Sequence, residues 1–291
     1  MPSGAITGVS RGLGSKFSIY QFEFLKQISA DPNKLVIGLV REKEAAQQKI
    51  ASELGEHPNV HIVYADLTQY DTIKAAAEDT AEITGGRLDY IIANGAYNSL
   101  LDAYYAVGVL GEKPQELEQV ALELYQTNAI GQLHLFNLFT PLLLKGKTKK
   151  AVAISSAQSD LDFINNVGAE ISTLYSMSKA ALNVVVAKFS AQYKKQGVLF
   201  LGICPGSVDV GYFKDVHSTP SSVVVSVPFD SNTLTNTSML AWYPSALVFL
   251  LPFTAPVCKM SEYQSKRDEY TDGTVKVTFS LPLRKLSPSS E

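Results

Sequence analysis

Residues 3–14 read Ser-Gly-Ala-Ile-Thr-Gly-Val-Ser-Arg-Gly-Leu-Gly, and this stretch decides the fold class. The apolar residues 5–6 predict a buried strand, and three glycines follow at the spacing Gly-x3-Gly-x-Gly. From Leu13 to Ile28, apolar side chains recur at steps of three and four residues, which predicts a helix. A glycine-rich turn between strand and helix lets backbone N–H groups approach a pyrophosphate at the positive end of the helix. The stretch therefore predicts a dinucleotide site.

The alternation of short apolar runs with helical patterns continues to about residue 206. The runs are rich in Val, Ile and Leu, as expected of strands that are covered on both faces. Predicted strands are 5–6, 35–40, 60–64, 88–93, 151–154 and 198–203, and further predicted helices are 42–54, 69–84, 114–144 and 173–195. Strands that alternate with helices form parallel βαβ units. We expect an α/β fold: a Rossmann-like doubly wound parallel sheet in a single, three-layer αβα domain.

The overall composition excludes several classes of protein. The 291 residues are 46% hydrophobic and 18% charged, with a net charge of −3. This balance attracts neither nucleic acid nor anionic lipid, so we expect neither as a partner. Cys204 and Cys258 cannot build a disulfide framework, and with four scattered histidines we expect no metal site. Motif residues follow Met1 almost at once without a signal peptide, so we expect a cytoplasmic location.

The composition changes after residue 206. Residues 216–260 hold only two formal charges, Asp230 and Lys259, and their prolines interrupt any helical stripe. Three interpretations stay open: a lid over a substrate pocket, an irregular tail, and a segment that touches a membrane. The apolar run 246–257 is shorter than the ~20 residues of a membrane span, so membrane contact is the least favoured. We expect residues 1–210 to form the core, and residues 211–291 to form an atypical lid or tail of the same domain.

Further landmarks accompany the glycine turn. The pattern Thr-Gly-x3-Gly-x-Gly at residues 7–14 resembles the fingerprint of short-chain dehydrogenases/reductases. Other motif residues of that family follow in the required order: Asp66, Asn94-Gly95, Asn128, Ser155-Ser156, Tyr175-x3-Lys179 and Pro205-Gly206. The similarity covers residues 4 to about 210. It implies an oxidoreductase with a nicotinamide cofactor.

A tyrosine and a lysine four residues apart suit proton transfer. The sequence has two such pairs, Tyr70/Lys74 and Tyr175/Lys179. Only the second lies on the helix after the fifth strand, beside the expected ligand crevice, so we expect the first to be a solvated neighbour pair. A phenol with a pKa near 10 is a slow proton donor, and an ammonium one turn away would lower that pKa by roughly two units. We therefore expect Tyr175 to act as the acid and base in carbonyl reduction.

Three further residues complete the expected catalytic set. Ser156 can hydrogen-bond the developing oxyanion, with Ser155 as the neighbouring candidate, and the resemblance favours the second serine. By resemblance, Lys179 also binds the nicotinamide ribose, and Asn128 anchors a water that relays protons from the lysine. The expected catalytic residues are Asn128, Ser156, Tyr175 and Lys179.

The choice between NAD and NADP depends on charge at the end of the second strand. Relatives that prefer NAD carry an acidic residue there, which binds the ribose hydroxyls. This chain has Arg41 at that point, and Arg11 in the glycine turn is aimed at the same corner. Two guanidinium groups suit a 2′-phosphate, so we expect NADP rather than NAD. Glu42, next to Arg41, is the alternative ribose ligand.

The resemblance implies the remaining cofactor contacts. Asp66 would bond the adenine amino group, and Asn94 with Gly95 would lie along the adenosine. The expected cofactor-binding residues are Gly8, Ser10, Arg11, Gly12, Leu13, Gly14, Arg41, Asp66, Leu67, Asn94, Gly95, Lys179, Pro205 and Gly206.

The expected function is NADP(H)-dependent interconversion of a carbonyl and a secondary alcohol. The low charge beyond residue 206 favours a small, largely apolar substrate. Tyr212, Phe213 and Trp242 are candidate pocket walls, although core packing explains each equally well, and residues 97–108 are the candidate opposite wall.

Two alternatives use the same core. One is a nucleotide-binding sensor or partner-binding protein without catalysis, and the other is a pocket repurposed for cyclisation or isomerisation. The intact set of Ser156, Tyr175 and Lys179 disfavours the second. Relatives commonly pair through the helices that carry Asn128 and Tyr175, so the resemblance implies a homodimer or homotetramer.

Overall fold

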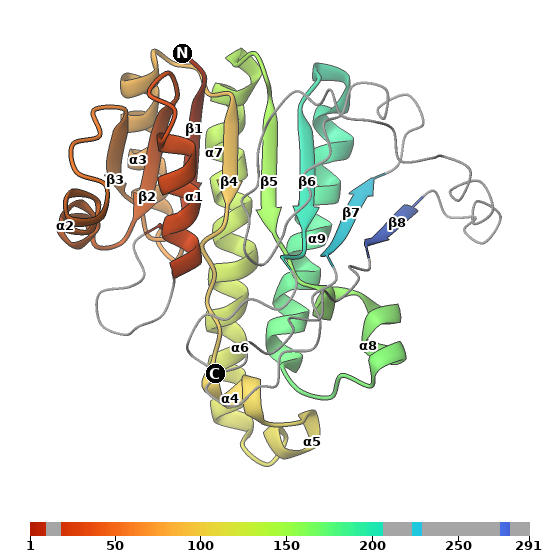
Figure 1. The fold of residues 1–291 in the computed structure, drawn as a ribbon. Helices are drawn as coiled ribbons and strands as arrows, with labels where there is room; N and C mark the ends of the chain where they lie inside the picture. The colour runs from red at the N-terminus through yellow and green to blue at the C-terminus, as the bar shows by residue number, and fades with distance from the viewer. Residues whose placement is uncertain (10–18, 206–222, 229–273, 280–291) are drawn as a thin grey trace, which may run out of the picture.

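A computed structural model describes residues 1–9, 19–205, 223–228 and 274–279. Its centre is a sheet with the strand order β3-β2-β1-β4-β5-β6-β7-β8 (Figure 1). The strands are β1 Ser3–Thr7, β2 Leu35–Val40, β3 Val60–Tyr64, β4 Tyr90–Ala93, β5 Lys150–Ile154, β6 Leu199–Ile203, β7 Val223–Pro228 and β8 Thr274–Phe279. Strands β1 to β6 run parallel, and β7 and β8 join antiparallel beside β6. The six predicted strands and the Rossmann-like parallel sheet are confirmed.

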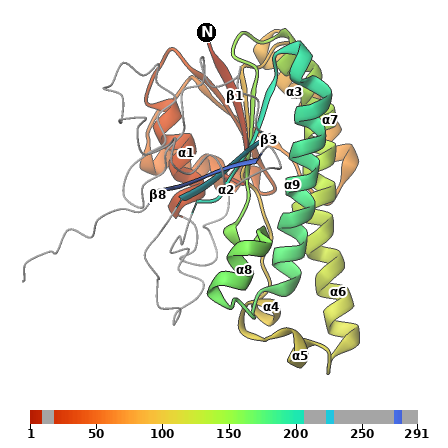
Figure 2. The ribbon, with the colours of Figure 1, turned by 90° about the vertical axis from the view of Figure 1, so that its right-hand side faces the viewer.

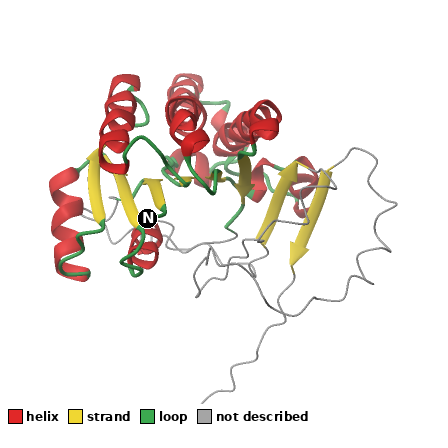
Figure 3. Cartoon of the chain, turned by 90° about the horizontal axis from the view of Figure 1, so that it is seen from above, coloured by secondary structure: helices red, strands yellow, loops and turns green. Residues whose placement is uncertain are grey.

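Helices cover both faces of the parallel strands. Their bounds are α1 Ile19–Ser29, α2 Lys43–Glu53, α3 Tyr70–Thr84, α4 Leu100–Tyr104, α5 Val107–Leu110, α6 Pro114–Tyr125, α7 Gly131–Lys145, α8 Leu161–Val167 and α9 Thr173–Tyr193. Helices α1 and α2 lie on one face, and α3, α7 and α9 lie on the other (Figure 2). Seen from above, the helices on one side stand in a row along the sheet (Figure 3). The structure therefore has the three layers that the sequence predicts.

Strand β2 shows why the predicted strands are apolar throughout. Ile37 and Leu39 pack in the cluster that contains side chains of α3, α7 and α9. Val36 and Val40 point the other way, into the cluster of α1 and α2. All four side chains are at most 1% exposed. Burying such a side chain contributes about 1.5–3 kcal/mol. Both faces of the strand therefore select apolar residues.

Several elements differ from the sequence predictions. The helix predicted over 114–144 contains a π-helical turn, Gln126–Ile130, between α6 and α7. Three short helices, α4, α5 and α8, were not predicted; they lie beyond the ends of the β4 and β5 arrows (Figure 1). Strands β7 and β8 were not predicted either, although the Val-rich run at 223–227 was a signal for β7.

Most of the predicted lid falls outside the described residues. Tyr212, Phe213 and Trp242 are among the residues whose placement is not described. The division of the chain at residue 210 stays a prediction. Among the helices that the structure describes, none is both long and apolar enough to cross a membrane.

Asp89 ties the amino ends of neighbouring strands together. One carboxylate oxygen accepts the N–H of Ser3 at 3.1 Å, and the other accepts those of Lys147 at 2.8 Å and Thr148 at 3.0 Å. Burial by itself raises the pKa of Asp89, but these three donors and the charge of Arg87 outweigh it, so the pKa lies below its ordinary 3.8. The ionised form therefore stabilises the junction.

We expect Asp89→Asn to reduce the free energy of unfolding at pH 7 by about 2–4 kcal/mol, because the amide group turns one acceptor into a donor. The lowered pKa means that the wild-type stabilisation is present above pH 3.8 and is lost as the pH falls through the lower, folded-state value. The difference between the two proteins should therefore shrink in acid. Urea denaturation at pH 7 and below pH 4 measures it. The exposed Asp79→Asn on α3 is the control, and an equal effect of both variants would contradict the assignment.

Candidate active site

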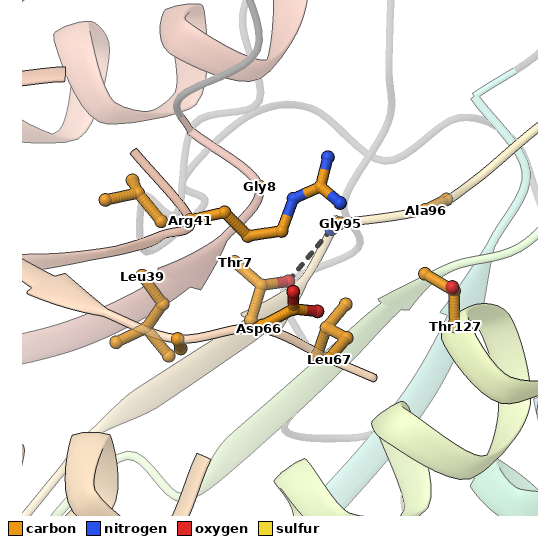
Figure 4. Close-up of a pocket in the computed structure, with 11 residues that line it drawn as sticks. Thr7, Gly8, Leu39, Arg41, Asp66, Leu67, Gly95, Ala96 and Thr127 are labelled. Atoms are coloured by element: carbon orange, nitrogen blue, oxygen red, sulfur yellow. Dashed lines mark hydrogen bonds between the residues drawn. The ribbon is translucent and has the colours of Figure 1, made fainter. Parts of the chain in front are cut away.

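A pocket opens where β1, β2, β3 and β4 end (Figure 4). Its lining residues are Thr7, Gly8, Leu39, Val40, Arg41, Ala65, Asp66, Leu67, Gly95, Ala96 and Thr127. In a doubly wound sheet the ligand crevice lies outside the carboxyl ends of the strands. The pocket is therefore in the position that the glycine turn predicts.

Backbone packing at Gly8 shapes the floor of this pocket. Gly8 has a φ of +78°, and a Cβ on it would lie 2.6 Å from the Cα of Gly95. Thr7 Oγ1 accepts the N–H groups of Asn94 at 3.0 Å and Gly95 at 2.8 Å. These contacts hold the ends of β1 and β4 so close that only glycine fits between them. The result is a side-chain-free surface that a phosphate-bearing ligand can approach.

Charged groups stand at the rim of the pocket. The exposed Arg41 side chain extends above the pocket, and the Asp66 carboxylate faces it from below (Figure 4). Thr68 fixes Asp66 by donating its N–H at 2.9 Å and its hydroxyl at 2.8 Å to Oδ1. The rim thus offers one cation for a phosphate group and one acceptor for an amino group.

The structure brings together five of the residues predicted to bind a cofactor: Gly8, Arg41, Asp66, Leu67 and Gly95. Asn94 lies behind them, because its Nδ2 donates to the Thr7 carbonyl at 3.1 Å and completes the β1–β4 junction. Pro205 lies two residues after the end of β6. The predicted residues 10–14 and Gly206 lie outside the described part of the chain.

The pocket also contains residues that the sequence analysis did not select. These are Thr7, Leu39, Val40, Ala65, Ala96 and Thr127. Most directly precede or follow a selected residue, so the ends of the predicted strands were the available signal. Thr127 was recognisable only as the neighbour of Asn128, because it reaches the pocket from the π-helical turn.

Tyr175 and Lys179 meet beside the end of β5. Both lie in the first two turns of α9, and Lys179 Nζ is 5.6 Å from the centre of the Tyr175 ring. Lys179 is only 2% exposed, and its Nζ donates to the carbonyl of Ile154 at 2.7 Å. Ile154 directly precedes the predicted serine pair in the chain. The helix therefore brings Tyr175 and Lys179 to the end of the strand that leads into Ser155 and Ser156.

Burial controls the protonation of this pair. It raises the pKa of Tyr175 above its ordinary 10, and the nearby Cys204 thiol adds to the rise. It lowers the pKa of Lys179 to about 8. The sequence analysis expected the lysine to lower the pKa of the phenol. That expectation was wrong, because burial of the phenol itself raises its pKa and outweighs any lowering by the lysine.

The two neighbouring serines have different surroundings. Ser155 Oγ donates to Asn183 Oδ1 at 2.6 Å, so its hydrogen is committed to α9. Ser156 Oγ accepts the N–H of Gln158 at 3.2 Å, and this contact uses no hydroxyl hydrogen. Ser156 is thus the serine whose hydroxyl retains a donor for a ligand.

Asn128 braces the loop after β4 against α9. Its Oδ1 accepts the Tyr97 N–H at 2.8 Å, and its Nδ2 donates to the Tyr97 carbonyl at 2.9 Å and to Ser178 Oγ at 3.0 Å. Both amide hydrogens are therefore used within the protein. The predicted water contact stays a prediction, and the side chain has a structural task that the sequence did not indicate.

Tyr70, of the other Tyr-x3-Lys pair, lies at the surface. It is 47% exposed at the start of α3, and its ring meets that of His134 edge-on at 5.0 Å between centroids. Lys74 is exposed on the same helix. The interpretation of Tyr70/Lys74 as a solvated neighbour pair is confirmed.

Comparison with known proteins identifies similar sequences. The family model of short chain dehydrogenases matches residues 5–221. The chain is 55% identical over 212 residues to the short-chain dehydrogenase/reductase iacC of Pestalotiopsis fici. The matched region covers 72% of this chain and 75% of that protein. It is 49% identical over 223 residues to the short chain dehydrogenase virK of Hypocrea virens, with 77% and 79% covered.

Solved structures share the fold. The NADPH-bound carbonyl reductase from chicken fatty liver superposes with a TM-score of 0.57 at 27% identity, over 75% of this chain and 81% of that chain. The carbonyl reductase Sniffer of D. melanogaster, at 23% identity, gives the same TM-score over 72% and 82%, and this likeness concerns the fold alone.

We expect the stability of the wild-type protein to rise between about pH 8 and pH 10, because the folded chain binds fewer protons at Lys179 than the unfolded chain does. Lys179→Met should weaken this rise, since it removes the titrating group. Above pH 10 the raised pKa of Tyr175 has the opposite effect on stability, because the folded chain then binds more protons at the phenol than the unfolded chain does. The predicted rise in stability therefore ends at about pH 10. Chemical denaturation across pH 7–10 measures the slope. The exposed Lys188→Met on the same helix should retain the wild-type slope, and a wild-type slope in Lys179→Met would refute the prediction.

Proposed function

Because the chain belongs to the short-chain dehydrogenase/reductase family, we propose that it is an NADP(H)-dependent oxidoreductase that interconverts a carbonyl and a secondary alcohol. One observation carries the proposal. Lys179 Nζ lies 5.6 Å from the Tyr175 ring while it donates to Ile154, two residues before Ser156. A proton donor, a cation and a hydroxyl thus share one edge of the sheet with the dinucleotide pocket.

The residues that line the pocket support NADP as the cofactor. The Gly8–Gly95 contact leaves no room for a side chain and suits the approach of a pyrophosphate. The Arg41 guanidinium suits a 2′-phosphate, and the Asp66 carboxylate suits the adenine amino group. When bound in reduced form, the nicotinamide would supply a hydride to the substrate carbon. The 27% identical carbonyl reductase is described as NADPH-bound, which supports the same choice here.

Tyr175 acts as the acid in the direction of reduction. Burial keeps the phenol protonated near neutrality, which is the form that donates a proton to a carbonyl oxygen. The tyrosinate that remains lies beside Lys179, whose charge offsets it. With a pKa of about 8, Lys179 can also return a proton to the phenol. Ser156 donates its free hydroxyl hydrogen to the same substrate oxygen.

Surroundings of the site favour a small, apolar substrate. Tyr175 packs against an apolar cluster that includes the half-buried Tyr97 and Leu101. Cys204 is buried and forms no disulfide within the described part of the chain, which supports a reducing location such as the cytoplasm.

Exposed apolar side chains support pairing of two copies. They stand one turn apart on α6, at Leu122 and Tyr125, and two turns apart on the adjacent α9, at Met177 and Val184. We propose a homodimer through this surface.

We expect Tyr175→Phe to lower kcat for NADPH-dependent ketone reduction by roughly 10²–10⁴-fold, because the acid is removed while its ring is retained. Absorbance of reduced nicotinamide, followed with a panel of ketones, measures turnover. Fluorescence of bound NADPH should be unchanged. Tyr70→Phe is the matched control, since it removes a phenol from the other Tyr-x3-Lys pair and should leave kcat within about twofold.

Two results would contradict the proposed chemistry. Equal losses in both tyrosine variants would remove the special role of Tyr175. Tight NADPH binding without turnover on a broad panel would favour the non-catalytic sensor instead.

We expect Arg41→Asp to reduce the preference for NADPH over NADH, measured as the ratio of kcat/KM values, by tenfold or more. The substitution removes the guanidinium at the pocket rim and introduces an acceptor for ribose hydroxyls. Lys43→Asp, which changes the net charge equally on the exposed start of α2, should leave the ratio unchanged. An unaltered ratio in Arg41→Asp would refute the assignment of Arg41 to the 2′-phosphate.

A further inference from the structure

The helix that carries Tyr175 begins without a cap of its own. Ser172 occupies the N-cap position of α9 with a φ of +60°, and its side chain makes no capping hydrogen bond. The first N–H groups of a helix have no partner inside the helix. In α9 these include the amides of Leu174 and Tyr175, the second and third residues. Their partner must therefore come from another part of the chain.

Asp102 of α4 supplies that partner from seventy residues away. Its Oδ1 accepts the N–H of Leu174 at 2.8 Å, and its Oδ2 accepts that of Tyr175 at 2.7 Å. Its backbone carbonyl accepts the Ser172 N–H at 2.9 Å. The same two segments are joined again by a β-bridge between Ala106 and Ile171. Asp102 is fully buried, with 0% of its surface exposed.

A buried carboxylate in this position is costly. Burial raises the pKa of Asp102, and the two amides of α9 act against the rise. Within the described part of the chain, no ion pair to Asp102 is found. The two N–H groups and the positive end of the α9 dipole offset the free-energy cost of burying the Asp102 carboxylate.

We propose that Asp102 is a positioning residue for Tyr175: its carboxylate holds the backbone amide of the proposed acid from α4. This inference rests on the proposed function. The Tyr175 carbonyl is held as well, because it accepts the hydroxyl of Ser178 at 2.7 Å, and Ser178 in turn accepts from Asn128. The Tyr175 N–H is thereby held from α4, and its carbonyl is held by Ser178 of the same helix, which Asn128 contacts from the π-helical turn. The first turn of the helix cannot shift without breaking one of these contacts.

The position of that turn matters for the reaction. A displacement of about 1 Å at a reacting group can cost roughly 10²-fold in rate. Lys179, one turn further, is fixed separately by the Ile154 carbonyl. Loss of the Asp102 contacts would therefore move the phenol relative to the ammonium and the serine, while the dinucleotide pocket at β1 and β2 stays intact.

The test compares Asp102→Asn with Asp89→Asn. Both variants replace a buried carboxylate that accepts backbone N–H groups, but Asp89 lies at the opposite, amino edge of the sheet. We expect Asp102→Asn to lower kcat at least tenfold with less than a twofold change in KM for NADPH. We expect Asp89→Asn to lower Tm by a similar amount with kcat within about twofold. If Asp102→Asn does not fold, Asp102→Glu, which keeps both oxygens and displaces them by one methylene, takes its place in the same comparison.

A second measurement does not depend on turnover. Hydrogen exchange of the Leu174 and Tyr175 amides should become faster in the Asp102 variant and stay unchanged in Asp89→Asn. A kcat within twofold of wild type, or a loss no larger than that of Asp89→Asn, would overturn the positioning role, and so would unchanged exchange at both amides. If the wild-type protein reduces no ketone at all, the proposed function fails, and the exchange result alone decides whether Asp102 holds Tyr175.

Discussion

The hydrogen bond from the buried Lys179 ammonium to the Ile154 carbonyl joins the helix of the proposed acid to the strand that leads into Ser156. Burying an ammonium is unfavourable, and the lowered pKa of Lys179, about 8, reflects this. The same contact sets the lysine beside the phenol. Together with the bond from Ser155 to Asn183, it fixes how the end of β5 and the start of α9 face each other. The burial of Lys179 is unfavourable, but it places the lysine between the end of β5 and the Tyr175 ring, where the proposed chemistry needs it.

Other polar side chains hold the frame around that bond. Thr7 of β1 accepts hydrogen bonds from the backbone at the end of β4. Asn128 links the loop after β4 to Ser178 of α9. Asp102 holds the start of α9 from the same loop region. Each of these side chains satisfies backbone groups that burial would otherwise leave unpaired. Side chains chosen by sequence motifs as ligand contacts, such as Asn94, therefore also serve as internal braces.

Much of the core was predictable, and the reasons are local. The six parallel strands are apolar on both faces because helices cover both, so their composition alone marks them. The short helices α4 and α8 span five and seven residues, too few to show a helical period. Strands β7 and β8 could not be predicted from the alternation of strands and helices, because they join the edge of the sheet antiparallel and are not part of a βαβ unit. The π-helical turn before α7 has no signature of residue type that separates it from the surrounding helix.

By itself, the sequence determined the sheet, the glycine turn and a short set of candidate residues, because periodicity and spacing are properties of neighbouring residues. It could not decide which candidates meet. The tertiary structure confirmed that Tyr70 is exposed, and it alone turned the Ser155 hydroxyl into α9 while leaving that of Ser156 available. Only packing decided that the pKa of Tyr175 is raised and not lowered, since the burial of its phenol depends on the whole surrounding fold. Asp102 carries no motif at all, and its place at Tyr175 arises from a contact between residues more than seventy positions apart.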